Sequence, residues 1–328
     1  MSLIVEALQP ALLRGVFAAT GPFPDQSLSD VFGSSRSAYL ATSDLASRSV
    51  ALAFPTFTDV THAVVTDCRR LSVSWLQSTL GCWPEVNDKL AIPWSLVRLY
   101  YSAFYASHVV VRLLGRACCW LEASHLLRID EVHRALTGLT LPFRAEPGSY
   151  LCAVDHPGSQ FTLSRISAGN RGAHEALWAT LEVAIRDRAP TILSGIVPTR
   201  DAQLVIAKLD EFRALAAQNG SNAWLSRVRN AIQYRMEHSV WHPTHVGVRE
   251  RREITRLVGA WQDDPMNLDL AAVRAKPLLM QFAAACTFLI ALCRALLSRI
   301  EQASLDRQRS FVRHGAWALA NVHGVKLT

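Results

Sequence analysis

The segment WLSRVRNAIQYRMEHSVWHP, residues 224–243, is dense in arginine, asparagine and histidine. On a helix, Arg227, Arg229 and Asn230 lie about one turn before Tyr234, and one more arginine and two histidines follow at helical or near-helical spacing. A guanidinium binds phosphate oxygens through paired hydrogen bonds, and an imidazole exchanges a proton near neutral pH. The segment therefore predicts a site that acts on a phosphodiester, with the candidate catalytic residues Arg229, Asn230, Arg235, His238 and His242.

A second stretch, IPWSLVRLYYSAFYASHVVVRLLG at residues 92–115, carries polar and aromatic side chains along one helix face. Alternating spacings of four and three place six of them in one row: Trp94, Arg98, Tyr101, Tyr105, His108 and Arg112. Small residues on the neighbouring face permit close approach of another helix. The sequence leaves two interpretations open, since the row either contacts a ligand or packs with its polar tips satisfied.

These two stretches together resemble the HEPN superfamily. The resemblance rests on Tyr100-Tyr101-Ser-Ala-Phe-Tyr-Ala on one long helix, followed much later by Arg229-Asn230 and an arginine-to-histidine spacing at a helix end. Members of this superfamily are helical bundles, often dimeric, that occur in toxin-antitoxin, CRISPR-associated and other prokaryotic defence systems, and many of them cut RNA without a metal. The resemblance covers about residues 92–120 and 220–300.

The family signature is an arginine, usually followed by a polar residue, then four to six residues and a histidine. Arg229 has the polar follower, but eight residues separate it from His238. Six residues separate Arg235 from His242, which fits, although Met236 follows that arginine. The resemblance thus implies a metal-independent endoribonuclease, and the alternative is a non-catalytic HEPN-fold scaffold subunit that binds a protein partner or a nucleic acid.

The mechanism implied by the resemblance is transesterification, in which the ribose 2′-hydroxyl attacks the adjacent phosphate. His242 or His238 would act as general acid or base, and Arg235 or Arg229 would stabilise the developing negative charge. A dimer would bring two copies of the group together. The residues expected to contact RNA are Arg98, Tyr101, Tyr105, His108 and Arg227.

The histidines also permit a metal site, because His238 and His242 are four residues apart and His245 is close. No Glu or Asp completes an HExxH motif, so we expect neither a metal nor another cofactor. A third interpretation is structural, with a histidine at the helix C-terminus and Trp241 packed beneath it. The chain carries no P-loop, dinucleotide glycine motif, nucleophile elbow or CxxC pair.

Helical periodicity dominates the rest of the sequence. Patterned segments are expected as helices at 58–80, 94–114, 118–136, 174–188, 201–218, 222–237, 250–261 and 268–304. Between them, two β-prone runs flank Asp155-His156-Pro157-Gly158 and predict a hairpin. We therefore expect an all-α protein, mainly a helical bundle, with a small β-hairpin insertion around 148–167. Residues 1–55 would form loops and short helices, and residues 56–328 a HEPN-like helical domain with a β insertion at about 140–170.

Composition agrees with a folded protein in a reducing compartment. The 328 residues are 50% hydrophobic, carry a net charge of +7 and include seven cysteines without a CxxC pair. The apolar stretch 277–297 is marginal for spanning a membrane and is expected as a buried helix. We therefore expect a cytoplasmic protein without membrane contact. Its expected partners are RNA and a protein of a defence or toxin-antitoxin system, in a homodimer or a hetero-complex.

Overall fold

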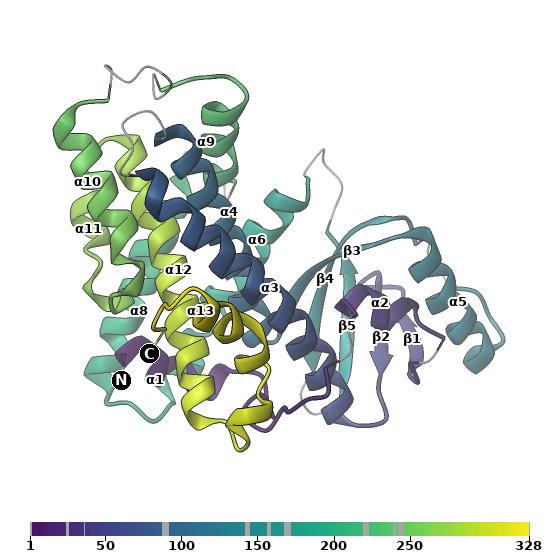
Figure 1. Ribbon diagram of the computed structural model, residues 1–328. Coiled ribbons are helices and arrows are strands. Elements are labelled where there is room, and N and C mark those ends of the chain that lie inside the picture. Colours follow the sequence, from purple (N-terminus) through teal and green to yellow (C-terminus); the bar gives the residue numbers. More distant parts are fainter. Residues whose placement is uncertain are drawn as a thin grey trace.

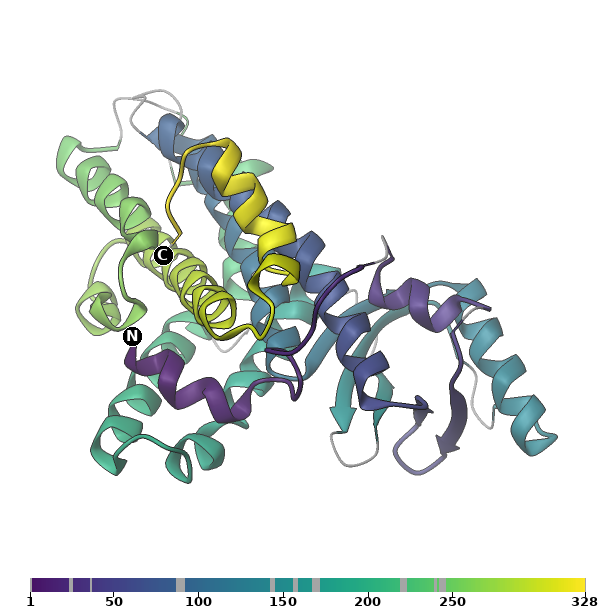
Figure 2. The ribbon, with the colours of Figure 1, turned by 60° about the horizontal axis from the view of Figure 1, so that its bottom comes forward.

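Two lobes lie side by side in the computed structural model of the chain, and one long helix, α3, reaches from one lobe into the other (Figures 1 and 2). One lobe is helical and the other is built on a β-sheet. The structure describes residues 2–23, 26–35, 37–86, 92–141, 145–155, 159–166, 172–218, 223–238, 241 and 246–327.

The helical lobe packs around the helix α12 and the antiparallel pair α3 and α4. Buried small residues, among them Ser102, Ala103 and Ala106, let α4 approach its neighbours closely. The helices of this lobe are α1 (Leu3–Leu8), α3 (Phe57–Val86), α4 (Ile92–Leu113), α6 (Ala173–Arg186), α7 (Ala189–Leu193), α8 (Thr199–Ala216), α9 (Trp224–Gln233), α10 (Val248–Gly259), α11 (Leu270–Val273), α12 (Leu278–Ala303) and α13 (Ala318–Val322). Short helical turns lie at Gln9–Ala11, Ala260–Gln262, Pro265–Asn267, Arg307–Arg309 and Arg313–Trp317.

The apolar helix α12 is the one helix in the described ranges that is long and hydrophobic enough to cross a membrane. Its most apolar 18-residue window is 83% buried inside the fold, which is consistent with the core helix of a soluble protein. Phe282, Phe288 and Leu289 on this helix are fully buried. The expectation of a buried helix in this stretch is therefore confirmed.

The sheet lobe contains five antiparallel strands in the order β1-β2-β5-β4-β3. Alternate residues such as Leu52, Phe161 and Leu163 are buried on one face, as period-two patterning requires. The helices α2 and α5 belong to this lobe (Figure 1). The elements are α2 (Leu28–Gly33), β1 (Leu40–Asp44), β2 (Ser49–Ala53), β3 (Arg116–Leu121), α5 (Ala123–Thr137), β4 (Gly148–Asp155) and β5 (Gln160–Arg165).

The expectation of an all-α fold with a small hairpin around 148–167 is wrong, because the chain is mixed α/β with a five-stranded sheet. The hairpin itself is present as β4 and β5. Three further strands were missed. β1 and β2 lie in a stretch rich in Ala and Ser, where strand propensity is weak, and β2 pairs with β5 more than 100 positions later. β3 runs almost directly into α5, so its residues 118–121 were predicted as the start of that helix.

Within the helical lobe, most expected helices are present with shifted ends. The expected helix 268–304 is divided, because Pro277 begins a new helix and α11 ends at Val273. The expected helix 222–237 ends earlier, at Gln233. Residues 2–55 contribute to both lobes, since α1 contacts α8 and α12 while β1 and β2 belong to the sheet.

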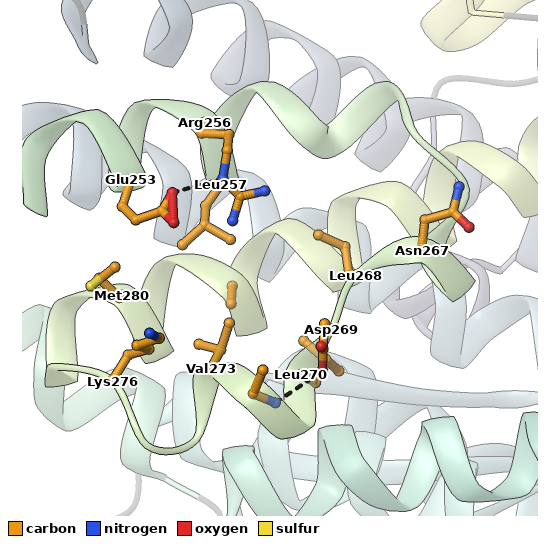
Figure 3. A pocket seen from close by; sticks show the side chains of 12 residues that line it. Glu253, Arg256, Leu257, Asn267, Leu268, Asp269, Leu270, Val273, Lys276 and Met280 are labelled. Atoms are coloured by element: carbon orange, nitrogen blue, oxygen red, sulfur yellow. Dashed lines mark hydrogen bonds and ion pairs between the residues drawn. The ribbon is translucent and has the colours of Figure 1, made fainter. Parts of the chain in front are cut away.

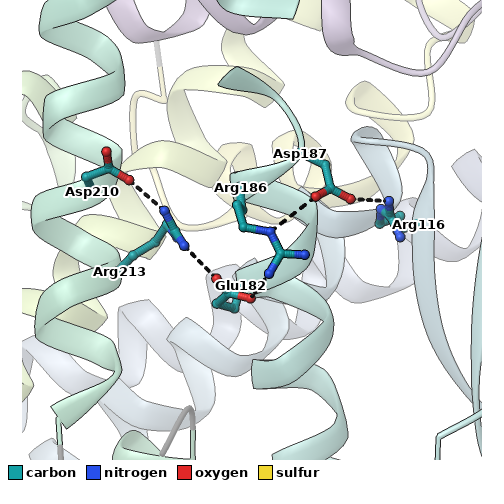
Figure 4. A network of polar contacts seen from close by, with 6 residues as sticks. All are labelled: Arg116, Glu182, Arg186, Asp187, Asp210 and Arg213. Atoms are coloured by element: carbon teal, nitrogen blue, oxygen red, sulfur yellow. Dashed lines mark hydrogen bonds and ion pairs between the residues drawn. The ribbon is translucent and has the colours of Figure 1, made fainter. Parts of the chain in front are cut away.

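A chain of ion pairs connects the two lobes (Figure 4). Arg116 on β3 lies 2.5 Å from Asp187, at the end of α6, and Arg186 bridges Asp187 to Glu182. Arg213 on α8 then contacts Glu182 at 2.7 Å and Asp210 at 2.7 Å. The polar network therefore links the sheet edge to α6 and then to α8.

A buried ion pair fixes α3 against α4. Arg112 Nε donates to Asp67 Oδ2 over 2.6 Å, and the two side chains are 5% and 9% exposed. Burial alone lowers the pKa of a guanidinium, but the facing carboxylate raises the pKa of Arg112 above its usual value. Arg112, expected on the same row as the ligand-contacting residues, therefore has a structural partner.

The substitution Asp67→Ala leaves the Arg112 guanidinium buried and unpaired, so the free energy of unfolding should fall by about 3–5 kcal/mol. The double variant with Asp67→Leu and Arg112→Met should recover most of that loss. Urea unfolding followed by circular dichroism measures both. The control Glu253→Ala removes the partner of the exposed Arg256 and should change stability by less than about 1 kcal/mol. Equal losses of unfolding free energy in Asp67→Ala and Glu253→Ala would contradict this role for the buried pair.

Candidate functional site

Arg229 on α9 is a buried cation enclosed by tyrosine rings. Its side chain is 5% exposed, and its guanidinium carbon lies 5.1 Å from the Tyr100 ring centre, 5.5 Å from that of Tyr101 and 5.7 Å from that of Tyr234. These distances are within the range of cation–π contact. We name Arg229, Tyr100, Tyr101 and Tyr234 the tyrosine cage.

The guanidinium has weak polar partners and no carboxylate within the described part of the chain. Its Nη1 lies 3.4 Å from Gln233 Oε1 and 3.4 Å from the Tyr234 hydroxyl, while its buried Nε has no hydrogen-bond partner there. Arg112, by comparison, faces Asp67 directly. Buried charges in proteins are normally paired, so Arg229 retains both a free donor and an uncompensated charge.

The pattern of α9 explains why this arginine is buried. Trp224, Leu225, Val228 and Ile232 form the apolar face of the helix, and Arg229 lies directly beside that face. Packing of the apolar face on α4 and α12 carries the arginine into the cage. The helix then ends, which leaves Tyr234 as the capping residue with its ring 66% exposed.

A directional chain of hydrogen bonds lies beneath the cage. The Trp178 indole N–H can only donate, and it lies 2.8 Å from Ser226 Oγ. Ser226 is 2.9 Å from the Tyr100 hydroxyl, which lies 2.8 Å from His174 Nδ1. Either hydroxyl can donate in the Ser226–Tyr100 bond, and the donor to or from Nδ1 depends on the tautomer of His174. In the arrangement in which each hydroxyl donates onward, Nδ1 accepts and the imidazole carries its proton on Nε2, as a second N–H donor beside the cage.

The charge state of His174 follows from its surroundings. Burial first, and then the positive charge of Arg229, lower the pKa of His174 to about 4. Burial also raises the pKa of Tyr100 to about 12. At neutral pH the group therefore consists of one cation and several neutral donors, which is an arrangement that attracts an anion. Since His174 is the second residue of α6, the N-terminal end of that helix dipole also favours negative charge here.

Of the five predicted catalytic residues, Arg229 alone lies in the cage among those described. Asn230 follows it and is half-buried, whereas Arg235 and His238 are exposed beyond the end of α9. Arg235 lies 3.7 Å from Glu237, and His238 has a left-handed φ of 64° in the turn that follows. His242 lies outside the described residues.

The five predicted RNA-contacting residues are dispersed. Tyr101 belongs to the cage, while Tyr105 packs edge-on to Phe104 with ring centres 5.7 Å apart. His108 Nδ1 lies 3.0 Å from Arg112 Nη1, and burial holds the pKa of His108 well below its usual value. The other two point elsewhere: Arg98 lies against Gly81 of α3, and Arg227 is exposed with its guanidinium 3.3 Å from the Gln218 carbonyl oxygen.

Sequence reasoning missed Tyr234, His174, Ser226 and Trp178 as members of the site. Tyr234 had a readable signal, because four residues separate it from Arg229 and it stands where the family signature would have a histidine. Ser226 lies on α9 three residues before Arg229, whereas His174 and Trp178 come from α6, and none of the three carries a pattern of its own. Within the described ranges, no group of three or more His, Cys, Asp and Glu side chains is arranged to hold a metal ion.

A separate pocket of about 250 Å³ lies between α10, α11 and the start of α12 (Figure 3). Most of its charged side chains already have partners within the protein. Glu253 pairs with Arg256 at 2.7 Å, and Asp269 accepts the backbone N–H of Ala272 at 2.9 Å as the cap of α11. Asn267 and Lys276 complete the polar part of the lining, and the remaining walls are apolar.

Comparison with known proteins identifies no relative. No protein-family model matches the chain, and neither the curated proteins nor the solved structures contain a match. The resemblance to the HEPN superfamily therefore stays a prediction from the residues quoted above.

The low pKa of His174 predicts a specific acid response. Because the folded pKa of about 4 lies below the unfolded value near 6.5, the stability due to neutral His174 is complete above pH 6.5 and is lost as the pH falls toward 4. Removing the positive charge with Arg229→Gln should raise the pKa of His174. Histidine NMR titration of full-length protein measures this pKa.

Arg227→Gln is the matched control, because Arg227 lies on the same helix but points to solvent. It should leave the pKa of His174 where it is in the wild type. An unchanged pKa in Arg229→Gln, or equal changes in both variants, would show that Arg229 does not act on this imidazole.

Proposed function

We propose that this chain is a HEPN-like, RNA-binding protein of a prokaryotic defence or toxin-antitoxin system, which works in the cytoplasm and holds an RNA phosphate at the tyrosine cage. The observation that carries the proposal is the buried Arg229 guanidinium, which faces tyrosine rings and no carboxylate among the described residues. A phosphate oxygen is the natural partner for such a group, because charge-assisted hydrogen bonds to guanidinium are strong and directional.

The free energies of burying and of pairing a guanidinium support an anionic ligand. Removing a guanidinium from water costs several kcal/mol even after relaxation, whereas each cation–π contact returns about 0.5–2 kcal/mol. Three tyrosine rings return about 1.5–6 kcal/mol, which is comparable with that cost, but they supply no negative charge to pair with Arg229. An arriving phosphate would supply the missing charge, with the His174 N–H and the exposed Tyr234 hydroxyl as further donors.

The position of the cage also supports the proposed family. The two segments on which the resemblance rests, Tyr100-Tyr101 and Arg229-Asn230, are about 130 positions apart in the sequence. In the fold, Arg229 lies over both tyrosine rings. The motif residues thus form one physical group, as expected for parts of one site.

The described geometry supports binding better than cleavage. His174 is neutral at physiological pH, and its Nδ1 is already bonded to Tyr100. His238 lies beyond the helix end, with no contact to Arg229. A general acid paired with Arg229 is therefore missing from the described residues, and the protein is proposed as the RNA-binding, non-catalytic form of this fold.

Fluorescence anisotropy with a labelled single-stranded RNA in EDTA tests the proposal. Wild-type protein should bind, and Arg229→Gln should weaken binding about tenfold, equivalent to about 1.4 kcal/mol. A plot of the logarithm of the binding constant against the logarithm of the salt concentration should also become shallower by about 0.7 in slope. This is the change expected for one lost phosphate contact on a single strand.

Arg134→Gln removes one positive charge from the sheet lobe, where Arg134 pairs with Asp130, and serves as the matched control. It should leave RNA affinity nearly unchanged. Absence of RNA binding by wild type, or equal binding by the two variants, would contradict the proposal. The same samples run on a gel report cleavage, and loss of intact RNA that is absent from a 2′-deoxy substrate would replace the binding-only form with a nuclease.

A further inference from the structure

A second cavity, of about 340 Å³, lies where the sheet lobe meets α3. Its lining includes Ser37, Phe54, Asp59, His62 and Thr66. This volume is within the range of small-molecule sites, which combine apolar walls with a few converging polar groups. The cavity shares no lining residue with the tyrosine cage and is therefore independent of the function proposed above.

Thr66 has an unused hydroxyl. Other buried helical hydroxyls bond back to the carbonyl four residues earlier, as Thr79 does to Trp75 at 2.9 Å and Thr180 to Ala176 at 2.9 Å. Thr66 is 2% exposed, and its Oγ1 has no partner within the described part of the chain. A buried hydroxyl without a hydrogen bond costs stability, and Thr66 lines the cavity, so a ligand that reaches this hydroxyl would supply the missing bond.

Two more polar groups lie on the same face of α3. Asp59, His62 and Thr66 are spaced by three and four residues, which places them in one row along the cavity. Asp59 accepts from the Thr56 hydroxyl and backbone N–H through Oδ2, so its Oδ1 stays available. His62 is half-buried, with its ring 6.0 Å from that of Phe23. The row therefore offers a carboxylate oxygen, an imidazole and a hydroxyl.

Phe54 adds an aromatic side chain to the cavity lining. Phe54 is held edge-on to Phe161 with ring centres 5.6 Å apart, and lies 5.5 Å from the Tyr39 ring. Its position is thus fixed by packing. None of the described lining residues is a lysine or an arginine, and Asp59 supplies negative charge. A phosphate or carboxylate would find no cationic partner among them.

We propose that this cavity binds a nucleobase or nucleoside, that is, a neutral planar heterocycle with N–H donors and without a phosphate. The ring would lie against Phe54, its amino group would donate to Asp59 Oδ1, and its ring nitrogens would meet the Thr66 hydroxyl and His62. Stacking on an aromatic side chain and edge hydrogen bonds are the usual means by which proteins hold single bases.

Isothermal titration calorimetry on the full chain tests the proposal, with adenosine, guanosine, cytidine and uridine as probes and benzoate as a planar anion. At least one nucleoside should bind, and benzoate should not. Thr66→Val keeps the shape of the side chain and removes its hydroxyl, so it should weaken that nucleoside about fivefold to tenfold, the worth of one hydrogen bond. Its thermal midpoint should be equal to or above that of wild type.

Thr287→Val is the matched control, because Thr287 on α12 is also fully buried with an unpartnered Oγ1 and does not line this cavity. It should leave nucleoside affinity unchanged. The proposal is overturned if no nucleoside binds wild type, if benzoate binds as well as the nucleosides, or if Thr66→Val and Thr287→Val bind equally.

Discussion

The rest of the structure depends on one constraint, a buried cation that has no counter-ion among the described residues. Arg229 lies under a surface formed by tyrosines, and its charge is compensated by ring faces instead of a carboxylate. Such an arrangement is costly for folding, since desolvation of the guanidinium consumes several kcal/mol and the ring faces supply no negative charge to pair with it. The fold tolerates it because the large apolar core around α12 supplies ample stability elsewhere. A cost retained in this way is typical of a site that gains its partner on binding.

The surrounding helices hold the cage in position. Tyr100 is fixed from below by the hydrogen bonds among Trp178, Ser226 and His174, so its ring cannot turn away from Arg229. The small residues of α4 allow α3 and α12 to pack closely, and the buried Arg112–Asp67 pair fixes α3 against α4. The ion-pair network from Arg116 to Arg213 then attaches α6, which carries His174, to its neighbours.

The sequence predicted the parts of the molecule that depend on local pattern. The helix at 94–114 and the hairpin around 148–167 have strong signals in proline, glycine and residue spacing, and both are present. The strands β1 and β2 have no comparable signal, because Ala and Ser pack on a sheet only when β5 is beside them. Non-local pairing of this kind decides that the fold is mixed α/β, and it cannot be read from one segment alone.

The same distinction holds for the site. Arg229 and Tyr101 were predicted from their spacing within one helix each, and both lie in the cage. His174 and Trp178 join it from α6, and their hydrogen bonds to Tyr100 and Ser226 become visible only after folding. The prediction that a histidine separated from an arginine by four to six residues would complete the site overlooked Tyr234, which is separated from Arg229 by four residues and contacts it.

The central claim is that Arg229 is poised to bind a phosphodiester, and arginine-selective NMR tests it most directly. The Nε–H resonance of Arg229 would be followed during titration with the dinucleotide UpU, with Arg112, already paired to Asp67, as an internal reference. The account predicts a saturable shift for Arg229 and none for Arg112. No shift at Arg229, or an equal shift of both resonances, would contradict it.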